Sequence, residues 1–196
     1  MPVQSGFDRR QPHAGQTIPF VRANVFAPFI GFLDAIGSPV ERRLQQARLP
    51  LSLLEDGEAL VPVVSAYRFL EVATRHEQID DFGLVVGQCA SAFELGAYGA
   101  ALQGATTVYE YLQLGTRLLG GHSSGTSIWL KAEGTALRVN QHLTGAPGDG
   151  RCIGDLFTLV VTINMLRRFI GPDWHPAEVR MMAGTEKMIQ GQEVFG

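Results

Sequence analysis

Apolar residues recur at helical spacing over most of the chain, in runs separated by segments rich in glycine, proline and aspartate. Residues three or four apart lie on one face of a helix, so each run predicts an amphipathic helix. Ser38 with Glu41, and Thr107 with Glu110, predict capping boxes at two helix starts. The predicted helices cover residues 25–36, 39–47, 63–73, 82–86, 95–102, 108–118 and 152–170.

Two later segments, TSIWLKAE and ALRVNQHL, alternate between apolar and other residues. Alternation places every second side chain on one face of a strand, so these segments predict strands over 126–133 and 136–143, joined by a turn at EGT. AEVRMMA predicts a third strand over 177–183. The predicted fold class is therefore α+β, with about six or seven helices packed on a small, mostly antiparallel sheet.

The helix predicted over 152–170 differs from the others because it is apolar on most of its sides. Such a helix suits a position buried between layers rather than on the surface. Arg167 and Arg168 stand in its last turn, where cations favour the helix dipole. Gly171 and Pro172 then predict the end of the helix.

Composition and charge limit the classes of function. The 196 residues are 45% hydrophobic and 18% charged, which suits one globular domain. Residues 1–22 are polar and lack periodicity, so we expect a flexible N-terminal arm before a domain over 23–196. The formal net charge of −3 provides no excess of lysine and arginine for nucleic-acid phosphates. We find neither a membrane span nor a signal peptide pattern, and expect a cytoplasmic protein.

Two short motifs raise the question of catalysis. GPDWHPAEVR contains Asp173 and His175, but its glycine and prolines suit the junction between a helix and a strand. GGHSSG contains His122 and two serines, but it lies between a helix and a strand, whereas a nucleophile elbow lies between a strand and a helix. Cys89 and Cys152 belong to no cluster with metal-binding spacing, so we expect reduced thiols. We therefore expect no enzyme activity, no metal and no cofactor.

Three blocks of sequence carry a resemblance to a known family: LPLSLLEDGEALVPVVSAYRFLEVATRH, then DDFGLVVGQCASAFELGAYGAALQGATTVYEYLQLGTRLL, and finally GPDWHPAEVRMM after the hairpin. They resemble the N-terminal effector-binding domain, of arabinose-binding type, of AraC-type transcriptional regulators. Within that group the chain is similar to the ornithine-utilisation-regulator-like branch. The resemblance covers about residues 24–196, and its most specific parts are FGLVVGQ, LGAYGAAL with ATTVYEYL, and PAEVR.

The resemblance implies a function in gene regulation. In such bacterial regulators this domain senses a small molecule or mediates dimerisation, and a C-terminal pair of helix-turn-helix units binds DNA. We therefore expect a small-molecule effector of unknown class, a homodimer, and DNA contact only through a C-terminal domain that is absent from this chain. The chain halts at GQEVFG, so we expect either a fragment of a longer regulator or a truncated gene product. Arabinose itself is not implied as the effector.

Effector pockets are mostly apolar with a few converging polar groups, which favours the inner face of the hairpin and the helices that cover it. Candidate ligand-binding residues are the polar or aromatic side chains that interrupt apolar elements. They are Tyr98, His122, Trp129, Arg138, Asn140, His142, Asn164 and Arg180. Structural explanations compete with this interpretation. Arg138, Asn140 and His142 share one strand face and are simply solvated if the opposite face is the core. Asn164 can make an internal hydrogen bond.

Two other functions remain open from the sequence. The first is an oligomerisation module that binds no small molecule, with the helix around Tyr98 and the helix over 108–118 as its interface. The second is a haem or gas sensor, in which His76 or His122 is the axial ligand.

Overall fold

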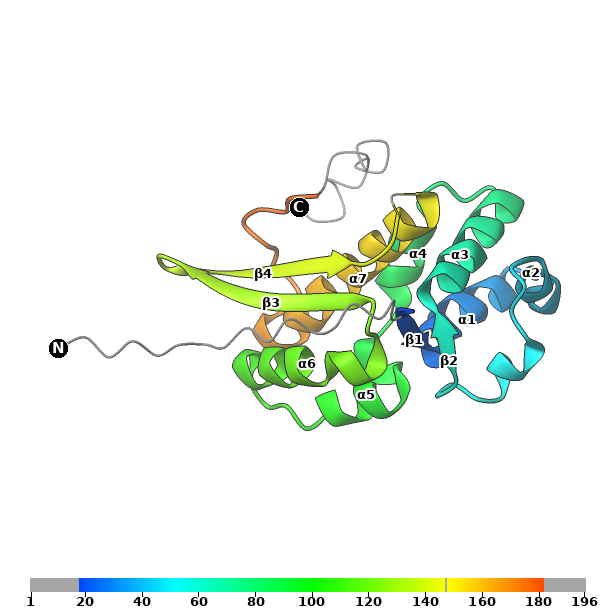
Figure 1. Ribbon diagram of the computed structural model, residues 1–196. Coiled ribbons are helices and arrows are strands. Elements are labelled where there is room, and N and C mark those ends of the chain that lie inside the picture. The colour runs from blue at the N-terminus through cyan, green and yellow to red at the C-terminus, as the bar shows by residue number, and fades with distance from the viewer. Residues whose placement is uncertain (1–17, 147, 182–196) are drawn as a thin grey trace.

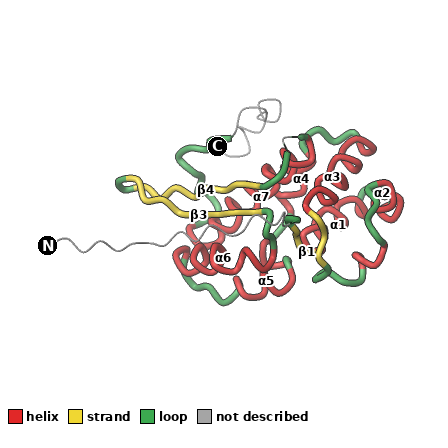
Figure 2. Tube along the Cα trace, in the orientation of Figure 1, coloured by secondary structure: helices red, strands yellow, loops and turns green. Residues whose placement is uncertain are grey.

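The computed structural model describes residues 18–146 and 148–181, and Figures 1 and 2 show how their helices and strands are arranged. In chain order, with η for a 3-10 helix, the elements are β1 (Phe20–Arg22), η1 (Ala23–Phe26), α1 (Ala27–Ala35), α2 (Val40–Gln46), η2 (Leu51–Leu54), β2 (Leu60–Pro62), α3 (Val63–Glu77), α4 (Phe82–Cys89), η3 (Ala92–Glu94), α5 (Gly96–Leu102), α6 (Val108–His122), β3 (Thr126–Glu133), β4 (Ala136–Leu143) and α7 (Asp149–Ile170). The α+β class is confirmed.

The core lies where α7 packs against α3 and α4. Buried residues occur along α7 from Gly150 to Leu166, which confirms the prediction of a helix enclosed by its neighbours. The ring of Phe157 on α7 contacts the ring of Phe29 on α1, with 4.6 Å between centroids. Phe29 in turn contacts Phe82 on α4 at 5.3 Å. Tilted aromatic pairs of this kind stabilise a core beyond the effect of their buried area.

Two glycines allow α4 to approach α7 closely. A Cβ atom on Gly83 would overlap the backbone carbonyl oxygen of Ile153, and a Cβ on Gly87 would lie 2.9 Å from the Cβ of Val160. Neither position therefore has room for a side chain in this packed interior. The glycines in FGLVVGQ are therefore contact positions for the central helix.

A second group of elements consists of α5, α6 and the β3–β4 ribbon. Helix α5 packs against α6, and β3 and β4 pair antiparallel with Thr126 opposite Leu143. In Figure 1 the ribbon extends past α6, away from α1 and α2. Leu130 and Val139 on its inner face pack against the core, whereas Leu137 near the turn is 52% exposed. The inner face of the ribbon therefore contributes to the interior as far as the pair of Leu130 and Val139.

Strand β1 connects the helical core around α7 with the group formed by α5, α6 and the ribbon. It pairs antiparallel with β2, and Phe20 lies opposite Pro62. The amide of Ser124, just after α6, donates to the carbonyl oxygen of Phe20 at 3.0 Å, and the amide of Phe20 donates to the Ser124 hydroxyl at 2.9 Å. The polar pattern of residues 1–22 predicts an arm that includes Phe20–Arg22, although these three residues form a strand. Residues 1–17, the rest of that arm, lie outside the described residues.

The prediction of a third strand over 177–183 is wrong for its described part. Residues 177–181 form no strand, and residues 182–183 lie outside the described residues. The chain here approaches the ribbon through side chains, since Arg138 on β4 forms a 3.8 Å ion pair with Glu178. Pro172 and Pro176 lack amide donors for a backbone ladder. The described strands form two separate two-stranded sheets rather than one.

The two predicted capping boxes have different outcomes. Thr107 caps α6, because its hydroxyl accepts a hydrogen bond from the Glu110 amide at 3.2 Å. Ser38 does not cap α2: its hydroxyl donates to Glu77 on α3 at 2.6 Å, and Pro39 occupies the capping position. The Glu77 carboxylate also accepts a hydrogen bond from Arg43 at 2.9 Å. The Ser38 side chain therefore helps to connect α2 to α3 and does not cap α2.

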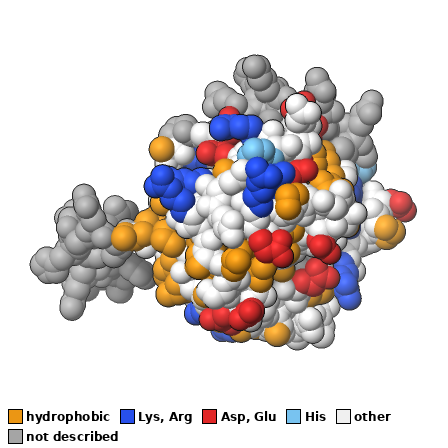
Figure 3. All heavy atoms as spheres, turned by 90° about the vertical axis from the view of Figure 1, so that its right-hand side faces the viewer, with side chains coloured by type: hydrophobic (Ala, Val, Ile, Leu, Met, Phe, Trp, Pro, Cys, Tyr) orange, Lys and Arg blue, Asp and Glu red, His pale blue; other side chains and the backbone are white. Residues whose placement is uncertain are grey.

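The surface over α1, α2 and α3 carries charges of both signs. Figure 3 shows this end of the molecule, where arginine side chains and carboxylates lie among small apolar areas. A nucleic-acid interface needs a continuous basic stripe. This face does not provide one. In the described part of the chain, none of the helices combines the length and the apolar character needed to cross a membrane.

We expect Gly83→Ala to lower the free energy of unfolding by about 1 to 3 kcal/mol, because the new methyl group meets a backbone oxygen that side-chain rotation cannot move away. Gly31→Ala is the matched control, since Gly31 also lies within a helix but has no atom near its Cβ position. Alanine favours the helix, so this control should gain up to about 1 kcal/mol. Urea denaturation of both variants measures the difference. Equal effects would contradict the close contact between α4 and α7.

Candidate functional site

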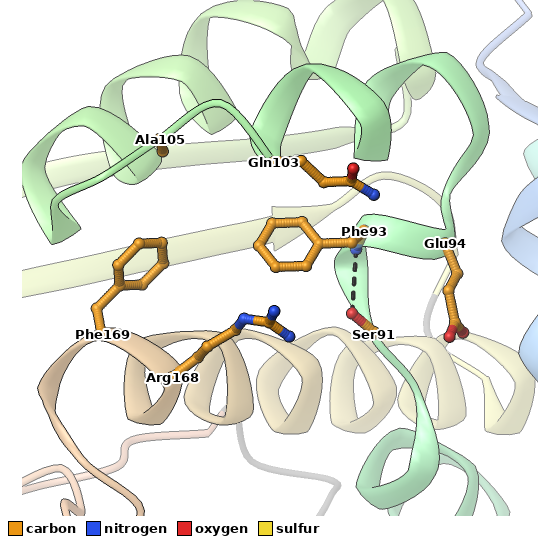
Figure 4. A pocket seen from close by; sticks show the side chains of 7 residues that line it. All are labelled: Ser91, Phe93, Glu94, Gln103, Ala105, Arg168 and Phe169. Carbon is orange, nitrogen blue, oxygen red and sulfur yellow. Dashed lines mark hydrogen bonds between the residues drawn. The ribbon is translucent and has the colours of Figure 1, made fainter.

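A pocket of about 660 Å³ lies between the last turn of α7, the η3 segment and the end of α5. Figure 4 shows the side chains that line it. They are Ser91, Phe93, Glu94, Gln103, Ala105, Arg168 and Phe169. Its volume is within the range of small-molecule sites, but four of its seven lining residues are polar or charged, whereas most such sites are lined mainly by apolar side chains.

Local sequence features position the two pocket walls. Ser91 starts η3, and its hydroxyl accepts a hydrogen bond from the Phe93 amide at 3.3 Å. On the other side, Gly171 ends α7 with φ at +135°, a conformation that favours glycine, and its amide donates to the Arg167 carbonyl oxygen at 2.8 Å. The pocket therefore lies between a capped 3-10 turn and a glycine-ended helix.

Arg168 provides the cation of the pocket. Its guanidinium carbon lies 4.8 Å from the centre of the Phe93 ring, so the two planar groups form a cation–π contact. The neighbouring Arg167 has a different role, because its Nε donates to the Trp174 carbonyl oxygen at 2.7 Å. Phe169 is held by Tyr111 on α6, with ring centroids 5.4 Å apart. Contacts within the protein therefore set the positions of the two rings and the guanidinium.

A second polar cluster surrounds Glu58, an exposed residue just before β2. Its Oε1 accepts from the side-chain amide of Asn24 and from the backbone amide of Ala97, both at 3.1 Å. Arg22 donates to the carbonyl oxygens of Glu58 and Gly121, each at 2.8 Å. The cluster therefore connects β1, η1, the start of α5 and the end of α6.

Gly96 makes the close approach in this cluster possible. It has φ at +56°, and a Cβ there would overlap the side chains of both Asn24 and Glu58. A left-handed residue without a side chain is therefore required at the start of α5.

Of the eight predicted ligand-binding residues, the structure brings Tyr98 and His122 into contact as a stacked pair. Their ring centroids lie 4.9 Å apart, and the Tyr98 hydroxyl donates to the Gly115 carbonyl oxygen at 3.2 Å. Burial raises the pKa of Tyr98 to about 12. Burial lowers the pKa of His122 to about 4, an effect that the Glu58 carboxylate opposes and the Arg22 cation reinforces. Both rings are therefore neutral at pH 7.

Four of the predicted residues lie together on the outer face of the ribbon, opposite the leucine face: Trp129, Arg138, Asn140 and His142. Trp129 is 49% exposed, and His142 is also exposed. Arg138 forms a 2.9 Å ion pair with Glu133. This face does not line the pocket described above.

The remaining two candidates have partners within the chain. The Asn164 side chain donates to the Gly87 carbonyl oxygen at 3.2 Å, which joins α7 to α4. Arg180 is exposed and forms an ion pair with Glu178. None of the eight predicted residues lines the pocket between η3, α5 and α7.

The groups that raised the question of catalysis contact backbone oxygens and hydroxyl groups rather than an acid–base partner. The His175 ring contacts the backbone oxygen of Asp173 at 3.3 Å, rather than its carboxylate. Ser123 is buried, and its hydroxyl lies 2.9 Å from the Thr126 hydroxyl. His76, one of the two histidines considered for haem, is exposed on α3. Among the residues described, no cluster of histidine, cysteine, aspartate and glutamate could hold a metal ion.

The residues that form the pocket are not among those that the sequence patterns mark. For Arg168 the pattern indicates only a cation at a helix end, and no pattern marks Phe93, Gln103 or Phe169 as ligand-binding residues. One available signal is the sequence RRFIGP, which places two cations and a ring at the end of an otherwise apolar helix. The partners from residues 91–105 are distant in sequence, so periodicity alone could not identify them.

The low pKa of His122 predicts a specific dependence of stability on pH. The unfolded chain, with an ordinary histidine pKa of 6.5, binds more protons than the folded chain between pH 6.5 and pH 4, so stability falls as the pH decreases through that window. We expect the loss between pH 7.5 and pH 5 to be about 2 kcal/mol smaller in His122→Phe than in the original chain.

The control for that measurement is His142→Gln, which removes an exposed histidine from β4. Urea denaturation at both pH values should give this variant the same loss as the original chain. If His122→Phe loses as much stability as the original chain, His122 is not the buried neutral group described above.

Comparison with known protein families places most of the chain within a family model. The model described as "Arabinose-binding domain of AraC transcription regulator, N-term" matches residues 37–196. A search of curated proteins finds no match.

Proposed function

The chain belongs to the family of N-terminal arabinose-binding domains of AraC transcription regulators, and from this premise we propose that it senses a small-molecule effector in the pocket between η3, α5 and α7. Family membership supports a ligand-sensing regulatory role rather than an enzymatic one. We choose this pocket as the site because a guanidinium and two aromatic rings converge there.

The proposal includes coupling to transcription through a DNA-binding domain outside this chain, in the cytoplasm of a bacterium. The pocket is well placed for such coupling. Arg168 lines it, and the adjacent Arg167 holds the Trp174 carbonyl oxygen in the segment that follows α7. An effector that binds one arrangement of this helix end more tightly than another would shift the population of the segment beyond it.

Dimerisation is a second part of the proposal, supported by exposed apolar side chains near α6. Tyr109 on α6 is 65% exposed, and Trp129 on β3 is 49% exposed. Aromatic residues are enriched at the centres of protein interfaces. A chain that pairs through these surfaces but binds no effector would be the oligomerisation module of the alternative hypothesis.

We expect thermal unfolding of the purified chain to shift upward with at least one compound from a panel of amino acids, polyamines, sugars, fatty acids and aromatic acids. A ligand at a hundred times its dissociation constant stabilises the folded state by about 2.7 kcal/mol, which a melting curve resolves readily. Light scattering on the same sample gives the oligomeric mass. A stable dimer whose melting temperature responds to no compound would contradict the sensor and favour the oligomerisation module.

A further inference from the structure

The chemistry of the pocket lining restricts what can bind there. Its side chains provide one guanidinium, one carboxylate, one carboxamide and two phenyl rings, from Arg168, Glu94, Gln103, Phe93 and Phe169. A cationic ligand would meet the guanidinium at close range, and a neutral sugar, although it could hydrogen bond to these polar groups, would leave the charge of the guanidinium without a counter-charge. A flat apolar group with a negative charge at one end satisfies both the rings and the guanidinium.

Arg168 is prepared to bind an anion. Within the described residues, no hydrogen bond or ion pair uses its guanidinium, which instead makes the cation–π contact with Phe93. Its neighbour Arg167, by comparison, is committed to Trp174. Contact with a ring leaves the N–H groups at the edge of the guanidinium available. A guanidinium in a defined position can bind a carboxylate with two parallel hydrogen bonds.

The rings provide the apolar part of the site. In Figure 4 the Phe93 ring points toward the side of the pocket where Phe169 lies, and Arg168 lies beside Phe93. Phe169 is supported from behind by Tyr111. Aromatic ligands pack well on such rings, through stacked or edge-to-face contacts. In this view the Arg168 guanidinium and the Gln103 carboxamide lie on opposite sides of the Phe93 ring.

Glu94 is the one group of the lining that would repel an anion. Figure 4 shows its carboxylate directed away from the two rings, on the far side of Phe93. The Ser91 hydroxyl is already used, since it accepts from the Phe93 amide. The Gln103 carboxamide is a further donor in the lining, on the opposite side of the Phe93 ring from Arg168 in Figure 4.

We propose that this pocket binds an aromatic carboxylate, with Arg168 holding the carboxylate group and Phe93 and Phe169 contacting the ring. This inference rests on the proposed sensor function and gives its effector a chemical class. The charge on the ligand and the cation at Arg168 provide the selectivity, while the rings provide the binding surface.

The experiment measures dissociation constants of the full chain by isothermal titration calorimetry. The probes are benzoate, cinnamate and indole-3-acetate, the neutral amides of the same three acids, acetate, and arabinose. We expect at least one aromatic acid to bind, and its amide to bind roughly 10 to 100 times more weakly, because a hydrogen-bonded ion pair is lost. Acetate should bind more weakly than the aromatic acid because it lacks the ring.

Arg168→Gln should weaken binding of that acid by a similar factor and bring the acid and its amide close to equal affinity. Arg117→Gln is the matched control, since it removes an exposed arginine from α6 outside the pocket. This control should leave both affinities unchanged. The comparison of acid with amide uses the unaltered chain, so the test stands even if Arg168→Gln folds poorly.

Two results would overturn the inference while the sensor function stands. One is an amide that binds as tightly as its acid, and the other is stabilisation by arabinose or a polyamine with no response to any aromatic acid. If no compound in this set or in the broader panel binds, both the inference and the proposed function fail.

Discussion

Gly83 and Gly87 let α4 approach the backbone of α7, and this contact determines how the other helices can pack. With α4 held there, Phe82 reaches Phe29, and Phe29 reaches Phe157, so that α1, α4 and α7 share one aromatic core. Asn164 adds a hydrogen bond to the Gly87 carbonyl oxygen. Larger residues at the two glycines would separate the helices and break these contacts together.

The polar cluster around Glu58 has a different role, since it positions elements that the aromatic core does not reach. Glu58 holds Asn24 and the Ala97 amide, and so fixes the start of α5 relative to η1. Gly99, one turn further along α5, packs against the backbone of η3. The wall of the pocket that carries Phe93 is therefore positioned by a carboxylate that does not itself line the pocket.

The sequence was informative where structure is local. Helical periodicity predicted all seven α-helices of the described residues, and alternation predicted the β3–β4 ribbon with its bounds. It missed β1 and β2, because strands of three residues are too short to show alternation. It failed at 177–181, where the pattern of AEVR resembles a strand but the chain makes one ion pair to the ribbon instead of a backbone ladder.

The candidate site was less predictable than the fold. Its residues come from three places, 91–94, 103–105 and 168–169, and their proximity depends on how α5 and α7 pack in three dimensions. Tyr98 and His122 are candidates because they are polar or aromatic residues that interrupt apolar elements, and the structure shows them as a stacked pair inside the protein. In the sequence, Arg167 and Arg168 are both cations in the last turn of one helix, and only the structure distinguishes their partners.

The place of α7 in the chain has a consequence for synthesis on the ribosome. The helices that it covers, α1, α3 and α4, are all made before residue 90, whereas α7 begins at Asp149. Until α7 has emerged, the aromatic side chains of Phe29 and Phe82 lack the partner that encloses them. Exposed apolar surface of this kind promotes aggregation, so the synthesis of residues 90–170 is the interval in which the unfinished domain is most vulnerable.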